Sequence, residues 1–138
     1  MIKNISAFRI LNIYLVLVAL HSFCVGIGLI FLPASQMALM GFNISENFFP
    51  DQGGIFHIIM CIAYILPVID VKKYYTFIFF TIVVKFIATV FLFTYYLFIN
   101  PILMVLISGI FDFLIGLVLL IIYNWYKKTV KSQYSQQQ

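Results

Sequence analysis

Charged side chains are scarce in this sequence. They make up 9% of its 138 residues, whereas 64% of the residues are apolar. An ordinary water-soluble domain has about 25% charged and about 45–50% apolar residues. A chain of this length forms one hydrophobic core and needs polar side chains to cover it, and this chain has too few. The scarcity of charge therefore excludes a typical soluble domain and predicts an integral membrane protein surrounded by the lipid bilayer.

The motifs of the common enzyme classes are also missing. The sequence has no Gly-rich phosphate-binding loop and no His, Cys and Glu spacing typical of a metal site. Ser108 and Gly109 lack the surroundings of a nucleophile elbow. The net charge of +4 comes without the soluble basic face that nucleic-acid binding requires. These absences argue against a metal site, a nucleic-acid partner and catalysis on a soluble substrate.

What the sequence does contain is four long apolar runs, at residues 10–32, 53–69, 74–99 and 101–123. A helix needs about 20 residues to cross a bilayer, and about 17 is the lower limit. The runs predict an all-α integral membrane four-helix bundle in a single domain of residues 1–131, with the second span the shortest. The polar residues 132–138 are predicted to form a disordered cytoplasmic tail.

The distribution of positive charge predicts the orientation. Seven of the eight Lys and Arg residues fall on one side of a four-span topology: Lys3, Arg9, Lys72, Lys73, Lys127, Lys128 and Lys131. The positive-inside rule assigns this side to the cytoplasm. We therefore expect a multi-pass protein of the cell membrane, in a bacterium the cytoplasmic membrane, with both termini in the cytoplasm. The first apolar run is too long for a cleaved signal peptide and is interpreted as a retained anchor.

The loop at residues 33–52 is the one external connection long enough to carry structure. Pro33 precedes a segment, residues 34–40, that is predicted to form a short amphipathic helix on the outer membrane surface, with Gly41 as its C-cap. Asp51 is placed to cap the second span at its start. This loop is either a cover over the outer end of the bundle or a gate for a ligand.

Two opposite charges lie inside the apolar runs. Lys85 and Asp112 are each about eleven residues into spans three and four, so an antiparallel hairpin puts both near the middle of the membrane. Unpaired charges at this depth cost several kcal/mol, so we expect an ion pair that faces the interior of the bundle. Small and hydroxyl residues at helical spacing support close contact of these two spans. These supporting residues are Thr81, Thr89, Ser108, Gly109 and Gly116.

The same count along the other two spans reaches His21 and Tyr64. His21, Tyr64, Lys85 and Asp112 are therefore predicted to form one hydrogen-bonded cluster at the midplane. Such clusters act as proton relays and ligand sites. Buried ionic groups also fix helix register without any chemistry, and the sequence leaves both interpretations open.

Cys24, His57 and Cys61 form a second predicted layer nearer the outer surface. A disulfide or a quinone-linked redox pair is one interpretation, and two thiols that pack as small apolar groups is the other. His21 and His57 are expected to differ in depth by about seven residues, roughly 10 Å, which is too far for two axial ligands of one haem iron within one chain. One histidine from each chain of a homodimer would avoid this objection. No cofactor is predicted, and haem and quinone remain alternatives.

The layout resembles that of a known group. A break at Pro33, a short external segment that ends at Gly41 and Phe42, Gly53 and Gly54 at the start of span two, and a polar residue in span four are similar to the small DoxX-like bacterial membrane proteins. This resemblance implies a four-span fold and an accessory role in a larger membrane complex, in some members a redox complex. It assigns no catalytic residue.

Two functions are expected from these features. In the first, the protein is an accessory or assembly subunit of a larger membrane complex, and the pair of Lys85 and Asp112 joins spans three and four. In the second, it is a proton-linked small-molecule transporter or a ligand-binding membrane protein with its site at the midplane cluster. Because one four-helix bundle encloses little volume, the second function favours a homo-oligomer.

Overall fold

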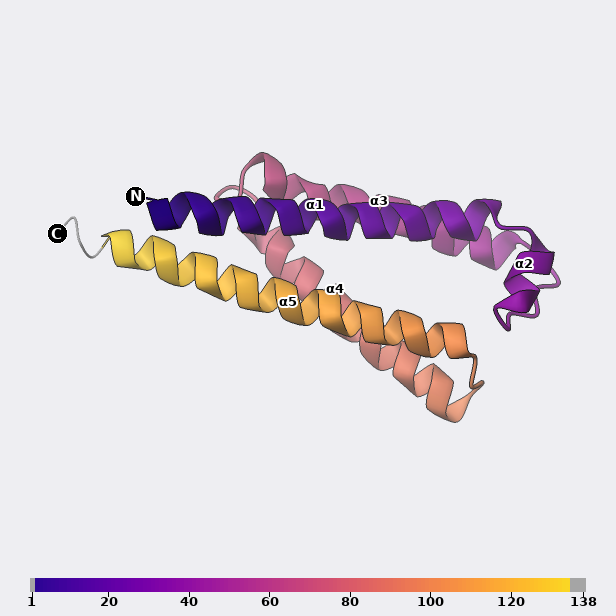
Figure 1. The fold of residues 1–138 in the computed structure, drawn as a ribbon. Coiled ribbons are helices and arrows are strands. Elements are labelled where there is room, and N and C mark those ends of the chain that lie inside the picture. The colour runs from indigo at the N-terminus through magenta and orange to yellow at the C-terminus, as the bar shows by residue number, and fades with distance from the viewer. Residues whose placement is uncertain (1, 135–138) are drawn as a thin grey trace.

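The computed structural model describes residues 2–134, which form helices joined by loops and contain no strand (Figure 1). The helices are α1 (Ile2–Phe31), α2 (Ala34–Leu39), α3 (Phe48–Ile69), α4 (Tyr75–Phe98) and α5 (Leu103–Tyr134). Four of them are long and apolar enough to cross a membrane. A helix satisfies all its own backbone hydrogen bonds, which apolar segments in a bilayer require. The prediction of an all-α chain with four candidate spans is confirmed, and the four helices indicate a multi-pass membrane protein.

The second long helix begins earlier than predicted. α3 starts at Phe48, five residues before Gly53, and its 22 residues are enough to cross a bilayer without strain. Pro50 is compatible with this start because the first turn of a helix needs no N–H donor. Asp51 lies within the first turn of α3 and does not cap it; the N-cap is Asn47.

The end of α5 also differs from the prediction. The helix continues to Tyr134, so residues 132–134 of the expected disordered tail are helical, and residues 135–138 lie outside the described part. No Gly or Pro follows the apolar run to end the helix. The hydroxyl of Thr129 also donates to the carbonyl oxygen of Trp125 within this last part of the helix.

The long helices are arranged as two antiparallel pairs. α1 packs along α3, and α4 packs along α5, whereas contacts between α1 and α5 are fewer and those between α3 and α4 fewer still. Figure 1 shows the two pairs close together at the end that holds both termini and diverging toward α2. The bundle is therefore closed at one end and open at the other.

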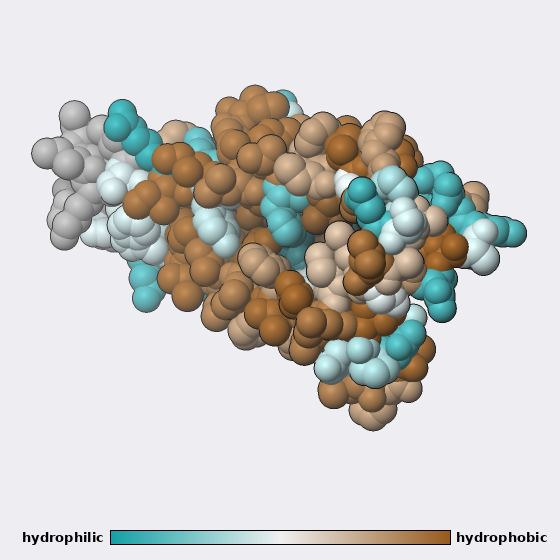
Figure 2. Space-filling model, turned by 45° about the vertical axis from the view of Figure 1, so that its right-hand side comes forward, coloured by the Kyte–Doolittle hydropathy of each residue, from teal (hydrophilic) through white to brown (hydrophobic). Residues whose placement is uncertain are grey.

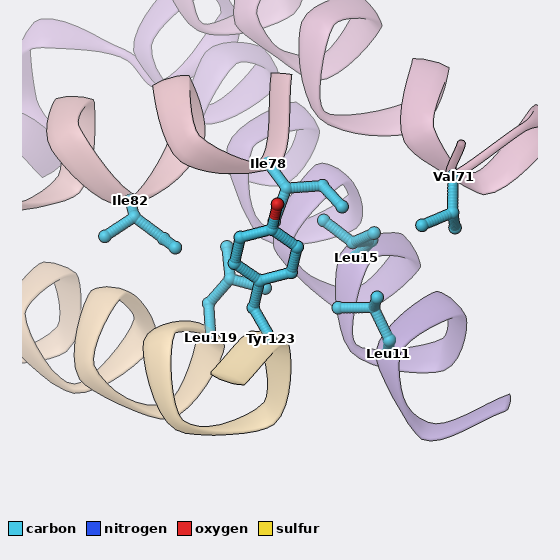
Figure 3. Close-up of a cluster of buried hydrophobic side chains, with 7 residues drawn as sticks. All are labelled: Leu11, Leu15, Val71, Ile78, Ile82, Leu119 and Tyr123. Atoms are coloured by element: carbon cyan, nitrogen blue, oxygen red, sulfur yellow. The ribbon is translucent and has the colours of Figure 1, made fainter. Parts of the chain in front are cut away.

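An apolar core holds the two pairs together at the closed end (Figure 3). It consists of buried side chains from α1, α4, α5 and the turn after α3, namely Leu11, Leu15, Val71, Ile78, Ile82, Leu119 and Tyr123. Nearby, the Tyr14 hydroxyl donates to the carbonyl oxygen of Ile115, at 3.2 Å, and so links α1 to α5.

At the open end, the segment of residues 33–47 joins α1 to α3. Its short helix α2 ends at Leu39, and Gly41 follows with a φ of +93°. The helix is one residue shorter than predicted, and its C-cap is Met40; Gly41, the predicted C-cap, is the next residue, in a left-handed conformation that favours glycine. A Cβ atom at Gly41 would lie 3.1 Å from Cγ2 of Ile102, in the turn between α4 and α5. The segment thus leaves α1 and touches the opposite pair before it reaches α3.

Candidate functional site

Lys85 of α4 and Asp112 of α5 form an ion pair in the interior. Lys85 Nζ lies 2.5 Å from Asp112 Oδ1, and the two side chains are 3% and 12% exposed. The predicted pairing of these residues is confirmed. Each charge is balanced by its partner, which offsets part of the cost of placing it in an apolar environment.

Two of the predicted small residues bring α4 and α5 close together around this pair. A Cβ atom at Gly116 would lie 3.1 Å from Cβ of Lys85, and one at Gly109 would lie 2.8 Å from the ring of Phe93. The glycines therefore allow an approach that larger residues would prevent.

The hydroxyl residues near the pair act differently from the glycines. Thr81 and Thr89 donate to carbonyl oxygens one turn earlier in α4, at 2.7 and 2.8 Å. Their hydroxyls are thus satisfied within their own helix and make no bridge to α5. Ser108 is exposed toward the space between the two helix pairs.

Tyr64 and His21 lie near the ion pair without joining it by hydrogen bonds. Tyr64 is buried, and Lys85 Nζ lies 5.9 Å from the centroid of its ring, within the range of a cation–π contact. The His21 ring is half-buried and stacks on Phe111, with 6.5 Å between the ring centroids. Among the described residues, the predicted hydrogen-bonded cluster is thus limited to Lys85 and Asp112.

A cleft of about 610 Å³ lies between the two helix pairs. All four long helices line it, and Phe42 from the 33–47 segment reaches it as well. Its walls are mostly apolar or aromatic, and five of its residues carry polar side chains: His21, His57, Tyr95, Ser108 and Asp112. Figure 2 shows that this apolar molecule has hydrophilic groups recessed in the middle of one flank. The cleft combines an apolar cavity with a few polar groups, which is typical of small-molecule sites.

Ser22 is a residue that the sequence did not single out. Its hydroxyl donates to the carbonyl oxygen of His57, at 2.9 Å, and lies 3.2 Å from Nδ1 of the same residue. A hydroxyl has one hydrogen to donate, so the second contact requires the ring to donate from Nδ1. A lone serine within an apolar run is the only sequence signal for this link.

The hydrogen bond between Ser22 and His57 corrects the predicted depths of the two histidines along the bundle. Because α3 begins at Phe48, His57 is level with Ser22, next to His21, and both histidines line the cleft. The predicted separation of about seven residues, roughly 10 Å, is therefore wrong, and the objection to a shared ligand based on it no longer holds. Tyr64 packs against Val18 and Ala19, further toward the closed end than the sequence predicted.

The two cysteines are free and do not contribute to the cleft. Cys24 is exposed, whereas Cys61 is half-buried and packs on the cluster of Val18, Ala19 and Tyr64. The disulfide considered from the sequence is not formed. Within residues 2–134, no group of three His, Cys, Asp or Glu side chains is placed to hold a metal ion.

A second cavity, of about 440 Å³, lies beneath the 33–47 segment. Leu29 and Phe42 line both this cavity and the cleft. The two spaces are therefore neighbours, with these two side chains between them.

The resemblance to DoxX-like proteins stays a prediction. No family model matches the chain, and neither the comparison with curated proteins nor the one with solved structures gives a match.

Proposed function

We propose that this protein binds a small amphipathic molecule in the cleft between its two helix pairs, as a ligand-binding or transport protein of the membrane. The observation that carries the proposal is a mostly apolar cavity of about 610 Å³ that reaches one member of a buried ion pair. Ligand sites have this composition, because apolar walls supply affinity and a few polar groups fix orientation.

The same residues support a coupling to protons. His21 and His57 line the cleft together with Asp112. Histidine changes its charge near neutral pH, and ionisable groups inside membranes commonly serve ion or proton pathways. In the proposed orientation both termini are in the cytoplasm, in a bacterium at the cytoplasmic membrane. The open end of the cleft and the 33–47 segment then face the outside.

The test is native mass spectrometry of the protein, extracted gently from its own membrane at native expression level. We expect a protein that carries a retained small mass. Ser108→Trp places a large ring in the cleft and should remove this mass, whereas Ile110→Trp on the same helix, outside the cleft, should keep it. Absence of a retained mass, or equal retention in both variants, would contradict the proposal.

A second candidate function is that of an accessory or assembly subunit of a larger membrane complex. The position of the ion pair favours it, because Lys85 and Asp112 join neighbouring helices of one hairpin and hold α4 to α5 whatever the cleft contains. The double substitution Lys85→Met and Asp112→Leu separates the two functions. Replacing a buried ion pair by apolar residues is often neutral for folding, so an accessory subunit should still assemble with its partners, whereas the ligand-binding protein should lose its retained mass.

A further inference from the structure

The ion pair has a direction with respect to the cleft. Asp112 lines the cleft, whereas Lys85 does not and is the more buried of the two. The stem of Lys85 packs at Gly116, and its ammonium group lies near the ring of Tyr64. The cleft therefore meets the negative end of the pair.

The Asp112 carboxylate has the capacity for another donor. Its Oδ1 accepts from Lys85, and the structure shows no second hydrogen bond to this carboxylate from the residues that it describes. An ionised carboxylate has about four acceptor positions on its two oxygens. A second positive group can thus approach from the cleft without displacing Lys85.

The other polar and aromatic groups of the cleft favour the same kind of ligand. His57 donates from Nδ1 to Ser22, which leaves Nε2 of the neutral ring as an acceptor. The rings of Phe91, Tyr95 and Phe111 line the cleft as well, and aromatic faces attract cations. No Lys or Arg is among the residues that line this cleft.

From this arrangement we infer that the cleft takes an organic cation with an apolar body, whose charge is held by the Asp112 carboxylate and the aromatic rings. The inference rests on the proposed function and adds the charge of the ligand to it. An anion of the same shape meets the negative end of the pair and no positive side chain, so the site discriminates by sign of charge.

The experiment compares two probes of one shape and opposite charge, tetraphenylphosphonium and tetraphenylborate. Each is titrated onto the full chain in phosphatidylcholine nanodiscs, and binding to empty nanodiscs is subtracted. We expect saturable binding of the cation, at least about tenfold tighter than that of the anion, since each factor of ten corresponds to about 1.4 kcal/mol.

Three variants locate the binding. The double variant Lys85→Gln and Asp112→Asn keeps polar groups at both positions but removes both charges, and should weaken cation binding about tenfold or more. Ser108→Trp should abolish it, and Ile110→Trp should leave it unchanged, because Ile110 does not line the cleft. Thermal unfolding of each variant checks that a loss of cation binding is not caused by a loss of the fold.

The outcomes separate this inference from the proposed function. Tighter binding of the anion that Ser108→Trp abolishes would overturn the cation assignment and leave the cleft as a binding site. Cation binding that survives the charge-neutral double variant would overturn the assignment to Asp112. If the cation does not bind, the assignment is also overturned, and the retained mass in the native spectrum still decides whether the cleft binds a ligand at all.

Discussion

A lysine surrounded by apolar side chains depends on its counter-ion. Lys85 is 3% exposed, and its charge is balanced by Asp112 alone among the described acidic groups. The Asp112 carboxylate and the ring of Tyr64 replace the water that the ammonium group of Lys85 loses. This environment makes the effect of a substitution depend on whether one charge or both are removed.

The first prediction concerns this dependence. Either single substitution, Lys85→Met or Asp112→Leu, leaves one charge without its counter-ion and should lower the free energy of unfolding by about 3–5 kcal/mol. The double variant Lys85→Met and Asp112→Leu should lose much less than the sum of the two single variants. Unfolding of all four proteins in a double-mutant cycle measures the difference. Additive effects would show that the two residues do not stabilise each other.

The second prediction concerns the link between Ser22 and His57. Ser22→Ala removes the donor to the His57 carbonyl oxygen and the contact with Nδ1. We expect a loss of about 1 kcal/mol in the free energy of unfolding, the usual net contribution of an intramolecular hydrogen bond. Ser35→Ala is the control, since Ser35 is exposed on α2. Equal effects of the two substitutions would show that the link contributes nothing.

At the scale of the helix, the contact of α1 with α3 depends on two facing glycines. A Cβ atom at Gly26 would lie 2.8 Å from the carbonyl oxygen of Gly54, and one at Gly54 would lie 2.7 Å from that of Gly26. Backbone atoms cannot move aside as the end of a flexible side chain can. Gly28 and Gly53 are neighbours in the same helices with more space, since their Cβ atoms would meet only leucine side chains, at 3.5 and 3.6 Å.

The third prediction follows from this difference in space. Gly26→Ala and Gly54→Ala should force α1 and α3 apart and destabilise the protein by about 1–3 kcal/mol, as overpacking does. Gly28→Ala and Gly53→Ala should be neutral or stabilising, because alanine is the better helix former. Thermal unfolding of the four variants compares them. A similar loss at all four positions would contradict the importance of the close contact.

The sequence predicted which segments form helices better than it predicted how those helices are aligned along one another. The apolar runs gave the four long helices because their length and composition determine whether a segment can span a bilayer. The pairing of Lys85 with Asp112 was predictable because few polar residues were present to choose from. The start of α3 was not, because Gly53 and Gly54 resemble a helix boundary but lie in the helix interior, where Gly54 packs against Gly26.

The position of the cleft could not be predicted either. It depends on how far the two helix pairs diverge, and this is set by tertiary contacts such as those of Leu119 in the core and Gly41 against Ile102. Hydrophobic periodicity shows that a helix has an apolar surface. It does not distinguish a face that contacts lipid from one that lines a cavity, since both are apolar.

At the scale of the whole molecule, the core at the closed end is the main attachment between the two pairs. Leu119 is fully buried there, whereas Val118 beside it is exposed on the surface. The fourth prediction is that Leu119→Ala destabilises the protein by about 2–5 kcal/mol through the cavity that it leaves. Val118→Ala should have a much smaller effect. Chemical unfolding of both variants tests this, and equal losses would show that the core is not the main attachment.

The location of that core at one end makes each helix pair a lever. The end of α4 at Phe98 lies 16 residues beyond the core residue Ile82, a distance of about 24 Å along the helix. A rotation of about 5° around the core therefore shifts this end by about 2 Å. Small changes in packing near the termini are thereby amplified at the mouth of the cleft. Gly41 lies against Ile102 at the far end of both pairs, where such a displacement is largest.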